Sequence, residues 1–127
     1  MSDKRVESFL LSIRFRNFKK LTNNIYKVEG HDLQCGICCI KDGIEMILSA
    51  KYDDIYHLHG SLCVVQSDGS DGSERKVGIF CTEKRKFILP ISHKNVNRLS
   101  MTTFIEVNSG NKVGIFSPES GNMYWKE

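Results

Sequence analysis

An internal repeat is the feature that most constrains how this chain can fold. When the sequence is shifted against itself by 37 residues, from position 9 to 46, and then by 41, from 46 to 87, apolar residues come into register along most of its length. The aligned columns are Phe9, Met46 and Phe87; Leu10, Ile47 and Ile88; Leu11, Leu48 and Leu89; Phe18, Ile55 and Val96; Leu21, Leu58 and Leu99; and Tyr26, Cys63 and Phe104. A Gly-Ile pair follows in each copy, at positions 36, 78 and 114. We therefore divide the chain into three copies, residues 9–45, 46–86 and 87–127.

Each copy contains four short apolar segments. In the second copy they are residues 46–50, 54–58, 62–66 and 77–81, and polar or glycine-containing turns separate them. Short apolar segments with regular turn signals are typical of β-strands. Three copies of four segments predict twelve strands in an all-β fold. The whole chain, residues 1–127, is long enough to enclose one hydrophobic core and is expected to form a single domain.

Repeats of about 40 residues occur in solenoids, propellers and closed three-fold barrels. Solenoids and propellers usually continue for more copies, and three copies of a solenoid would leave two open ends, so the sequence favours a closed barrel. The segments that carry a family resemblance are residues 102–107, 111–116 and 123–125 of the third copy, with 62–65, 76–80 and 87–89 of the second. In their order of strands and turns they resemble the intracellular β-trefoil superfamily, closest to its fascin-like and hisactophilin-like branch.

The resemblance implies a pseudo-threefold β-trefoil-like barrel in a permuted phase. Residues 9–13 would then form a second strand with no first strand ahead of it. Residues 113–116 would close the barrel beside the N-terminal strands, which leaves residues 123–125 as a surplus segment. The resemblance also implies cytoskeletal or scaffold partners.

The N-terminal segment has a second interpretation. Val6, Phe9, Leu10, Ile13 and Leu21 lie partly at helical spacing among basic residues, as in an amphipathic helix for a membrane surface or a partner groove. We favour a strand over residues 4–21, because the segment has counterparts in the other two copies.

Basic residues gather in two clusters, although the net charge is only +3, with 18 Lys+Arg against 15 Asp+Glu. The candidate binding residues are Arg14, Arg16, Lys19 and Lys20 in the first cluster, and Lys84, Arg85 and Lys86 in the second. In the trefoil interpretation the second cluster lies at a hairpin tip. Such groups attract phosphates, acidic proteins or anionic lipid head groups. The alternative is a solvated face that keeps the protein soluble.

The cysteines suggest the cell interior. There are five of them, an odd number, and no secretory signal is apparent, which indicates reduced thiols in the cytoplasm or nucleus. A zinc site built from Cys35, Cys38, His57, His59 and Cys63 is the alternative, but the spacing of the second group is irregular. We expect the cysteines to pack in the core as small hydrophobic residues and expect no metal.

No catalytic motif is present. The chain has neither a nucleophile elbow nor a phosphate-binding glycine loop, so we expect no enzyme, no catalytic residues and no cofactor. The Ser- and Asp-rich residues 67–73 are expected to form a flexible loop and not a cation site. No apolar run is long enough to span a membrane. We predict a non-enzymatic intracellular binding module for a protein partner, with nucleic-acid or anionic-ligand binding through the basic clusters as the alternative. A lectin-like site at Tyr124 and Trp125 has less support.

Overall fold

The computed structural model describes residues 9, 11–22, 24–41, 43–67, 75–99 and 102–126. Its twelve strands confirm the all-β prediction. They are β1 (Asn17–Thr22), β2 (Ile25–Glu29), β3 (Cys35–Ile40), β4 (Ile44–Tyr52), β5 (Asp54–His59), β6 (Leu62–Ser67), β7 (Lys76–Cys81), β8 (Lys86–His93), β9 (Asn95–Arg98), β10 (Ile105–Asn108), β11 (Val113–Phe116) and β12 (Met123–Lys126).

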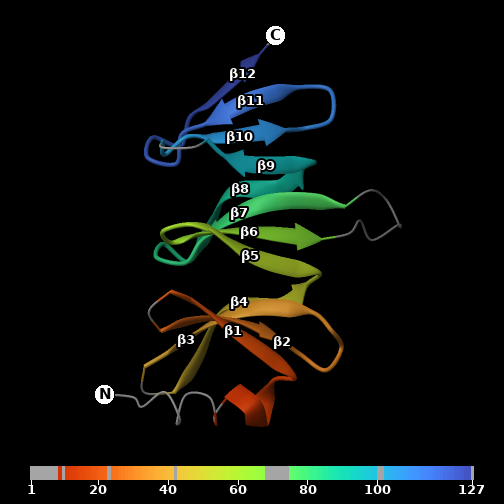
Figure 1. The fold of residues 1–127 in the computed structure, drawn as a ribbon, viewed down its shortest axis with the longest axis vertical. Helices are drawn as coiled ribbons and strands as arrows, with labels where there is room; N and C mark the ends of the chain where they lie inside the picture. Colours follow the sequence, from red (N-terminus) through yellow and green to blue (C-terminus); the bar gives the residue numbers. More distant parts are fainter. Residues whose placement is uncertain are drawn as a thin grey trace.

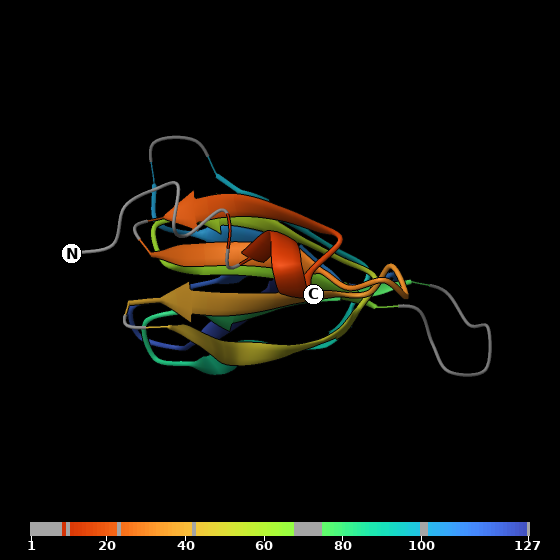
Figure 2. The ribbon, with the colours of Figure 1, turned by 90° about the horizontal axis from the view of Figure 1, so that it is seen from below.

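The strands form three separate antiparallel sheets of four consecutive strands each. Sheet A holds β1 to β4, sheet B holds β5 to β8 and sheet C holds β9 to β12, each in chain order. Figure 1 shows the three sheets stacked along the long axis of the molecule. Figure 2 looks along that axis onto sheet A, whose four strands lie side by side. We call the face of each sheet that points toward the N-terminal end its lower face, and the opposite face its upper face.

Three apolar clusters hold the stack together. The first lies below sheet A, where Leu11 and Phe15 pack with Val28 of β2. The second lies between sheets A and B and joins Ile37 of β3 to Val65 of β6. The third lies between sheets B and C and includes residues of β6 to β11. Because side chains alternate along a strand, each sheet can contribute to the cluster above it and to the one below it.

The strand register confirms the repeat. Val28, Val65 and Val107 occupy the same place on the second strand of each sheet. In the first strands they pair with Phe18, Ile55 and Val96, which form one of the predicted columns. In the third strands they pair with Gly36, Gly78 and Gly114 of the predicted Gly-Ile pairs. One column shifts by a residue, because Ile105 and not Phe104 is equivalent to Tyr26 and Cys63.

The glycine of the Gly-Ile pair allows a close approach between strands. Opposite Gly36 and Gly78 the fourth strand carries two extra residues, so that β4 and β8 both bend there. A Cβ atom at Gly36 would lie 2.6 Å from the carbonyl oxygen of Leu48, and one at Gly78 would lie 2.7 Å from that of Leu89. A side chain has no room at either position, which explains why the repeat keeps a glycine there.

The joints between sheets repeat as well. One residue separates β4 from β5 and one separates β8 from β9, namely Asp53 and Lys94. Their backbone N–H groups donate to the carbonyl oxygens of Gln66 (2.9 Å) and Asn108 (2.7 Å). Arg16 makes the same bond to Glu29 ahead of sheet A, at 2.9 Å. Each sheet therefore starts from the same hydrogen-bonded joint.

The closed barrel predicted from the trefoil resemblance is not found in the described part of the chain. Strand pairing stays within each sheet, and β11 lies between β10 and β12 at the opposite end of the stack from sheet A (Figure 1). Residues 123–125, predicted to be surplus, belong to β12, the fourth strand of sheet C. The predicted copies also start one strand early, since the sheets begin at Asn17, Asp54 and Asn95, eight residues after the predicted starts at 9, 46 and 87.

The predicted strand over residues 9–13 is wrong. Phe9 and residues 11–14 are helical, and the Phe15 N–H donates to the Leu11 carbonyl oxygen at 2.8 Å. Leu11 and Phe15 lie four residues apart and are both buried under sheet A, whereas Phe9 and Ile13 are exposed. A strand would place Phe9, Leu11, Ile13 and Phe15 on one face, whereas a helix groups Leu11 with Phe15 and turns Phe9 and Ile13 away, as their exposure requires. Residues 4–8 lie outside the described residues.

Candidate interaction surfaces

The upper face of sheet C is the first candidate surface. Ile105, Val107 and Phe116 point down into the cluster between sheets B and C. The alternate residues of β10 and β11 therefore point up, and no sheet covers them in the described part of the chain (Figure 1). We define the upper face of sheet C by its exposed and half-buried side chains: Asn95, Asn97, Leu99, Phe104, Glu106, Asn108, Val113, Ile115, Tyr124 and Lys126.

Equivalent positions in the other sheets are buried. Val113 is 39% exposed, while its register equivalents Cys35 and Val77 are 2% and 3% exposed beneath the following sheet. Tyr124 is 58% exposed, while its equivalents Leu48 and Leu89 are 8% and 5% exposed. The upper face of sheet C thus carries large apolar side chains at the positions where sheets A and B receive a neighbour.

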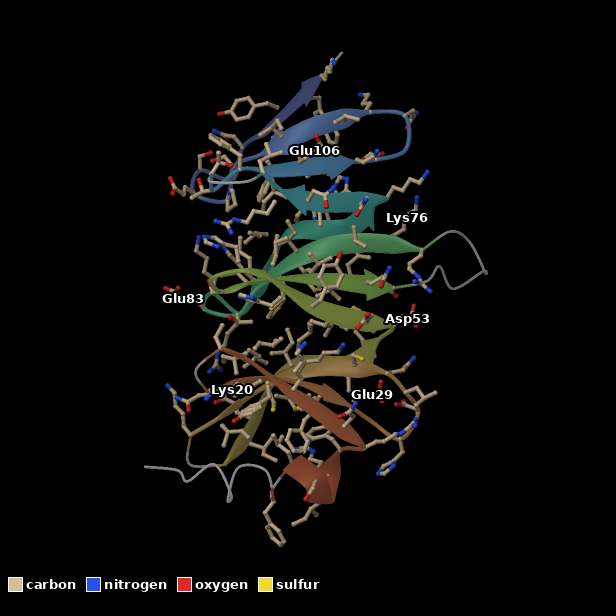
Figure 3. The ribbon with its side chains drawn as sticks, in the orientation of Figure 1. Lys20, Glu29, Asp53, Lys76, Glu83 and Glu106 are labelled. Carbon is tan, nitrogen blue, oxygen red and sulfur yellow. The ribbon has the colours of Figure 1, made fainter. Side chains whose placement is uncertain are left out.

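A charged position on this face has a partner in sheet A. Glu106 is equivalent to Lys27, because both pair with the isoleucine of the Gly-Ile motif. Lys27 points at sheet B, where its Nζ lies 2.5 Å from Oδ1 of Asp54. Figure 3 shows Glu106 on sheet C at the upper end of the stack, where none of the sheets formed by the described residues supplies such a partner. The Lys27–Asp54 pair shows that a charged side chain at this position is compatible with sheet packing when the covering sheet carries the opposite charge.

A cleft between sheets A and B is the second candidate. It has a volume of about 320 Å³ and is lined by Lys19, Lys20, Leu21, Lys27, Asp54, Ile55, Tyr56 and His57. Burial alone would raise the pKa of the Asp54 carboxyl, but hydrogen bonds from Lys27 and from the Ile55 N–H outweigh it and lower the pKa below its ordinary value. His57 Nε2 donates to the Gly60 carbonyl oxygen at 2.8 Å. Lys27 and Asp54 neutralise each other, so the cleft is a joint between two sheets more than an anion site.

The first basic cluster lies at the level of sheet A, partly on the helical segment below it and partly on β1. The guanidinium of Arg14 lies over the ring of Phe15, 5.3 Å from its centroid. Arg16 precedes β1, and Lys19 and Lys20 lie on β1, the outer strand of sheet A. All four residues are exposed.

The second basic cluster lies at the turn between β7 and β8, the hairpin tip that the sequence predicts. Arg85 adopts a left-handed backbone conformation with φ of 57°. Its guanidinium is hydrogen-bonded to the carboxylate of Glu45 on β4, and this bond lowers the pKa of Glu45. Lys84 and Lys86 are exposed. Figure 3 shows Lys20 and Glu83, the neighbour of the second cluster, on the same side of the stack, at the heights of sheets A and B.

The cysteines are core residues, as predicted. All five are free and buried. Burial raises the pKa of Cys38 and of Cys63 to about 11. Cys35 lies in the cluster between sheets A and B, whereas Cys38 lies in the cluster below sheet A, so the two thiols of this pair point to opposite faces of β3. Within the described residues, no group of three or more His, Cys, Asp or Glu side chains is arranged to hold a metal ion.

One buried histidine lies at the joint between sheets B and C. His93 Nδ1 shares a hydrogen bond of 2.6 Å with the hydroxyl of Ser109. Its ring lies 6.0 Å from that of Trp125, measured between centroids. Burial, followed by the charge of Lys76, lowers the pKa of His93. Sequence inspection gives no sign of this joint, because its three residues are far apart in the chain.

Comparison of the chain with known protein families, curated proteins and solved structures finds no match. In the described ranges, no helix is long and apolar enough to cross a membrane. The predicted loop at residues 67–73 lies outside the described residues apart from Ser67, which ends β6.

Proposed function

We propose that this chain is a non-enzymatic protein-interaction module that binds its partner on the upper face of sheet C. The observation that carries the proposal is the exposure of Val113 and Tyr124 at positions that are buried in both other sheets. Exposed apolar side chains grouped on one face mark interaction sites. The polar rim of Asn95, Asn97 and Asn108 is the usual surrounding of such a centre.

One feature supports a location inside the cell. The thiols are buried and free, which suits the reducing cytoplasm or nucleus. A cytoskeletal or scaffold partner rests on the fascin-like resemblance alone, and the strand pairing adds nothing to it, because the sheets do not close a barrel. The partner class is therefore proposed from the chemistry of the face: a protein surface with an apolar centre and a cation that can reach Glu106.

The alternative function is binding of nucleic acid or another anionic ligand. The exposed ammonium groups of Lys19, Lys20, Lys84 and Lys86 favour it. Arg85 contributes less, because Glu45 already neutralises it. Binding through these residues would weaken steeply with salt, since each neutralised phosphate releases counterions.

Affinity capture from a cell lysate, with and without nuclease and at two salt concentrations, separates the two functions. The variants are Tyr124→Lys on the face and Lys84→Glu/Lys86→Glu at the hairpin tip. Defined proteins that survive nuclease and are lost with Tyr124→Lys support the interaction module. Recovery that collapses with nuclease, salt and the hairpin variant, but withstands Tyr124→Lys, overturns the module in favour of the alternative.

A further inference from the structure

We infer that the upper face of sheet C packs against the same face of a second copy of this chain, in a two-fold symmetric dimer. The inference rests on the proposed function, because it names the partner of the same face. Within the described residues, the upper face of sheet A is covered by sheet B, and the upper face of sheet B is covered by sheet C. The interface that we infer thus continues the packing mode that already builds the molecule.

The face is suited to pairing with itself. Its central strand β11 presents Val113 and Ile115, and its flanking strands β10 and β12 present Glu106 and Lys126. A two-fold axis parallel to β11 would place β10 of one copy over β12 of the other. Apolar side chains then meet at the centre, and the carboxylate of Glu106 comes within reach of Lys126 of the second copy on both sides of the axis.

The charge pair reproduces a contact already made inside the chain. Lys27, at the position equivalent to Glu106, is paired with Asp54 of the covering sheet. With the sign reversed at Glu106, the covering sheet has to supply a cation, and Lys126 supplies it in the two-fold arrangement. Lys27 is then paired with Asp54 inside the chain, and Glu106 with Lys126 of the second copy.

Head-to-tail stacking is the competing arrangement. It would place the upper face of one copy against the lower end of the next, where Phe9 and Ile13 are 64% and 66% exposed. The lower face of sheet A is already covered by Leu11 and Phe15, however, so the sheet-on-sheet contact of the repeat is blocked there. Head-to-tail contacts also leave a free end on every copy and grow into open chains, whereas the two-fold arrangement stops at two copies.

The size of the face sets the expected affinity. Four strands of four residues, spaced about 4.8 Å apart and about 14 Å long, have a plan area of roughly 270 Å². Stable interfaces bury about 800 Å² on each partner, so this dimer is expected to be weak and reversible. We expect a dissociation constant on the order of 0.1–1 mM.

Sedimentation equilibrium of the full chain, from about 0.01 to about 2 mM, tests the inference. The wild type is expected to approach twice the monomer mass and to stop there. Tyr124→Lys is expected to weaken the dimer at least tenfold, while the matched control Phe9→Lys, at an equally exposed aromatic position on the other end, leaves it unchanged. Circular dichroism checks that each variant is folded.

A charge exchange provides the second measurement. Glu106→Lys and Lys126→Glu alone are each expected to weaken the dimer about threefold to tenfold, because like charges then face each other twice in the dimer. The double variant restores the wild-type association. A pair in contact shows this compensation, and two independent surface charges do not.

Three outcomes overturn the inference. They are a monomer at every concentration, continued growth past two copies with loss of growth in Phe9→Lys, and single charge variants that the double variant does not rescue. If the chain is monomeric but Tyr124→Lys still abolishes capture of a protein from lysate, the self-association fails and the proposed function stands. If the dimer forms and nothing else is captured on the face, the second copy is the partner.

Discussion

Replacement of Gly78 by alanine tests the sheet geometry most directly. A Cβ at this position would lie 2.7 Å from the Ile91 nitrogen and the Leu89 carbonyl oxygen, and 2.8 Å from the carbonyl carbon of Pro90. All three atoms belong to the backbone of β8, so no side chain can rotate away. Relief requires that β8, the outer strand of sheet B, moves outward and loses part of its pairing with β7.

The expected destabilisation lies in the upper part of the range for overpacking, at about 2–3 kcal/mol. That is a large share of the roughly 5–15 kcal/mol by which a domain is usually stable. Urea unfolding followed by circular dichroism measures it as a lower midpoint at unchanged slope. Gly43→Ala is the matched control: nothing lies within 4 Å of its Cβ, and it is expected to leave stability unchanged or raise it by up to about 1 kcal/mol.

Equal midpoints for the Gly78→Ala and Gly43→Ala variants would refute the reasoning. Such a result would mean that β8 does not bend over Gly78. The shared bulge of β4 and β8, and with it the physical explanation of the Gly-Ile repeat, would then be wrong.

Three further predictions concern the core and the joints. Burial and Lys76 lower the pKa of His93 below its ordinary 6.5, so the unfolded chain binds the proton more readily than the folded chain, and the stability present above about pH 6.5 is expected to fall as the pH drops. Urea midpoints at about pH 7.5 and 5.5 should therefore differ more in the wild type than in His93→Gln. Equal differences in the two proteins would contradict this. The Cys63 thiol, with a pKa of about 11, is expected to resist alkylation by iodoacetamide at about pH 8 in the folded chain and to react once urea unfolds the chain. Rapid alkylation of Cys63 in the native protein would contradict its burial. Leu11→Ala is expected to lower the free energy of unfolding by about 2–5 kcal/mol, since Leu11 is fully buried. The control Phe9→Ala, at a 64% exposed position, is expected to change it by no more than about 0.5 kcal/mol. A similar loss in both variants, measured by urea unfolding, would contradict the helical packing under sheet A.

Apart from residues 9–13, which are helical, and one column that shifts by a residue, the sequence was sufficient to find the strands and their equivalences. The column Phe18, Ile55 and Val96 and the three Gly-Ile pairs fall at matching register positions, because burial and close backbone approach restrict which residues fit there. The same alternation arises in a barrel strand and in a strand of a stacked sheet, since both bury side chains. Which strand pairs with which depends on contacts between distant residues, and for that reason the all-β prediction is confirmed whereas the predicted closed barrel is not found in the described part of the chain.

For the candidate surfaces, too, some features can be predicted from the sequence and others only from the structure. The run of Lys84, Arg85 and Lys86 is visible in the sequence, and its place at a turn follows from the apolar segments on either side. The partner of Arg85, Glu45, lies 40 residues away and has no signature in the sequence. Val113 directly precedes the third Gly-Ile pair, and the residues that precede the other two pairs, Cys35 and Val77, are buried. The exposure of Val113 appears only in the three-dimensional structure, where no sheet formed by the described residues lies above it.

The two ends of the stack differ in a way that bears on function. Each sheet of a stacked repeat gains stability from neighbours on its faces, and terminal units need a cover or a polar outer face. At the lower end the helical segment supplies the cover with Leu11 and Phe15. At the upper end the face is intermediate in character: Glu106 stands where sheet B has Val64, but Val113, Ile115 and Tyr124 stay apolar. A fully apolar face would demand a permanent cover, and a fully polar one would need none. A mixed face of this kind suits a partner that binds and dissociates, which is the kind of contact that we propose for sheet C.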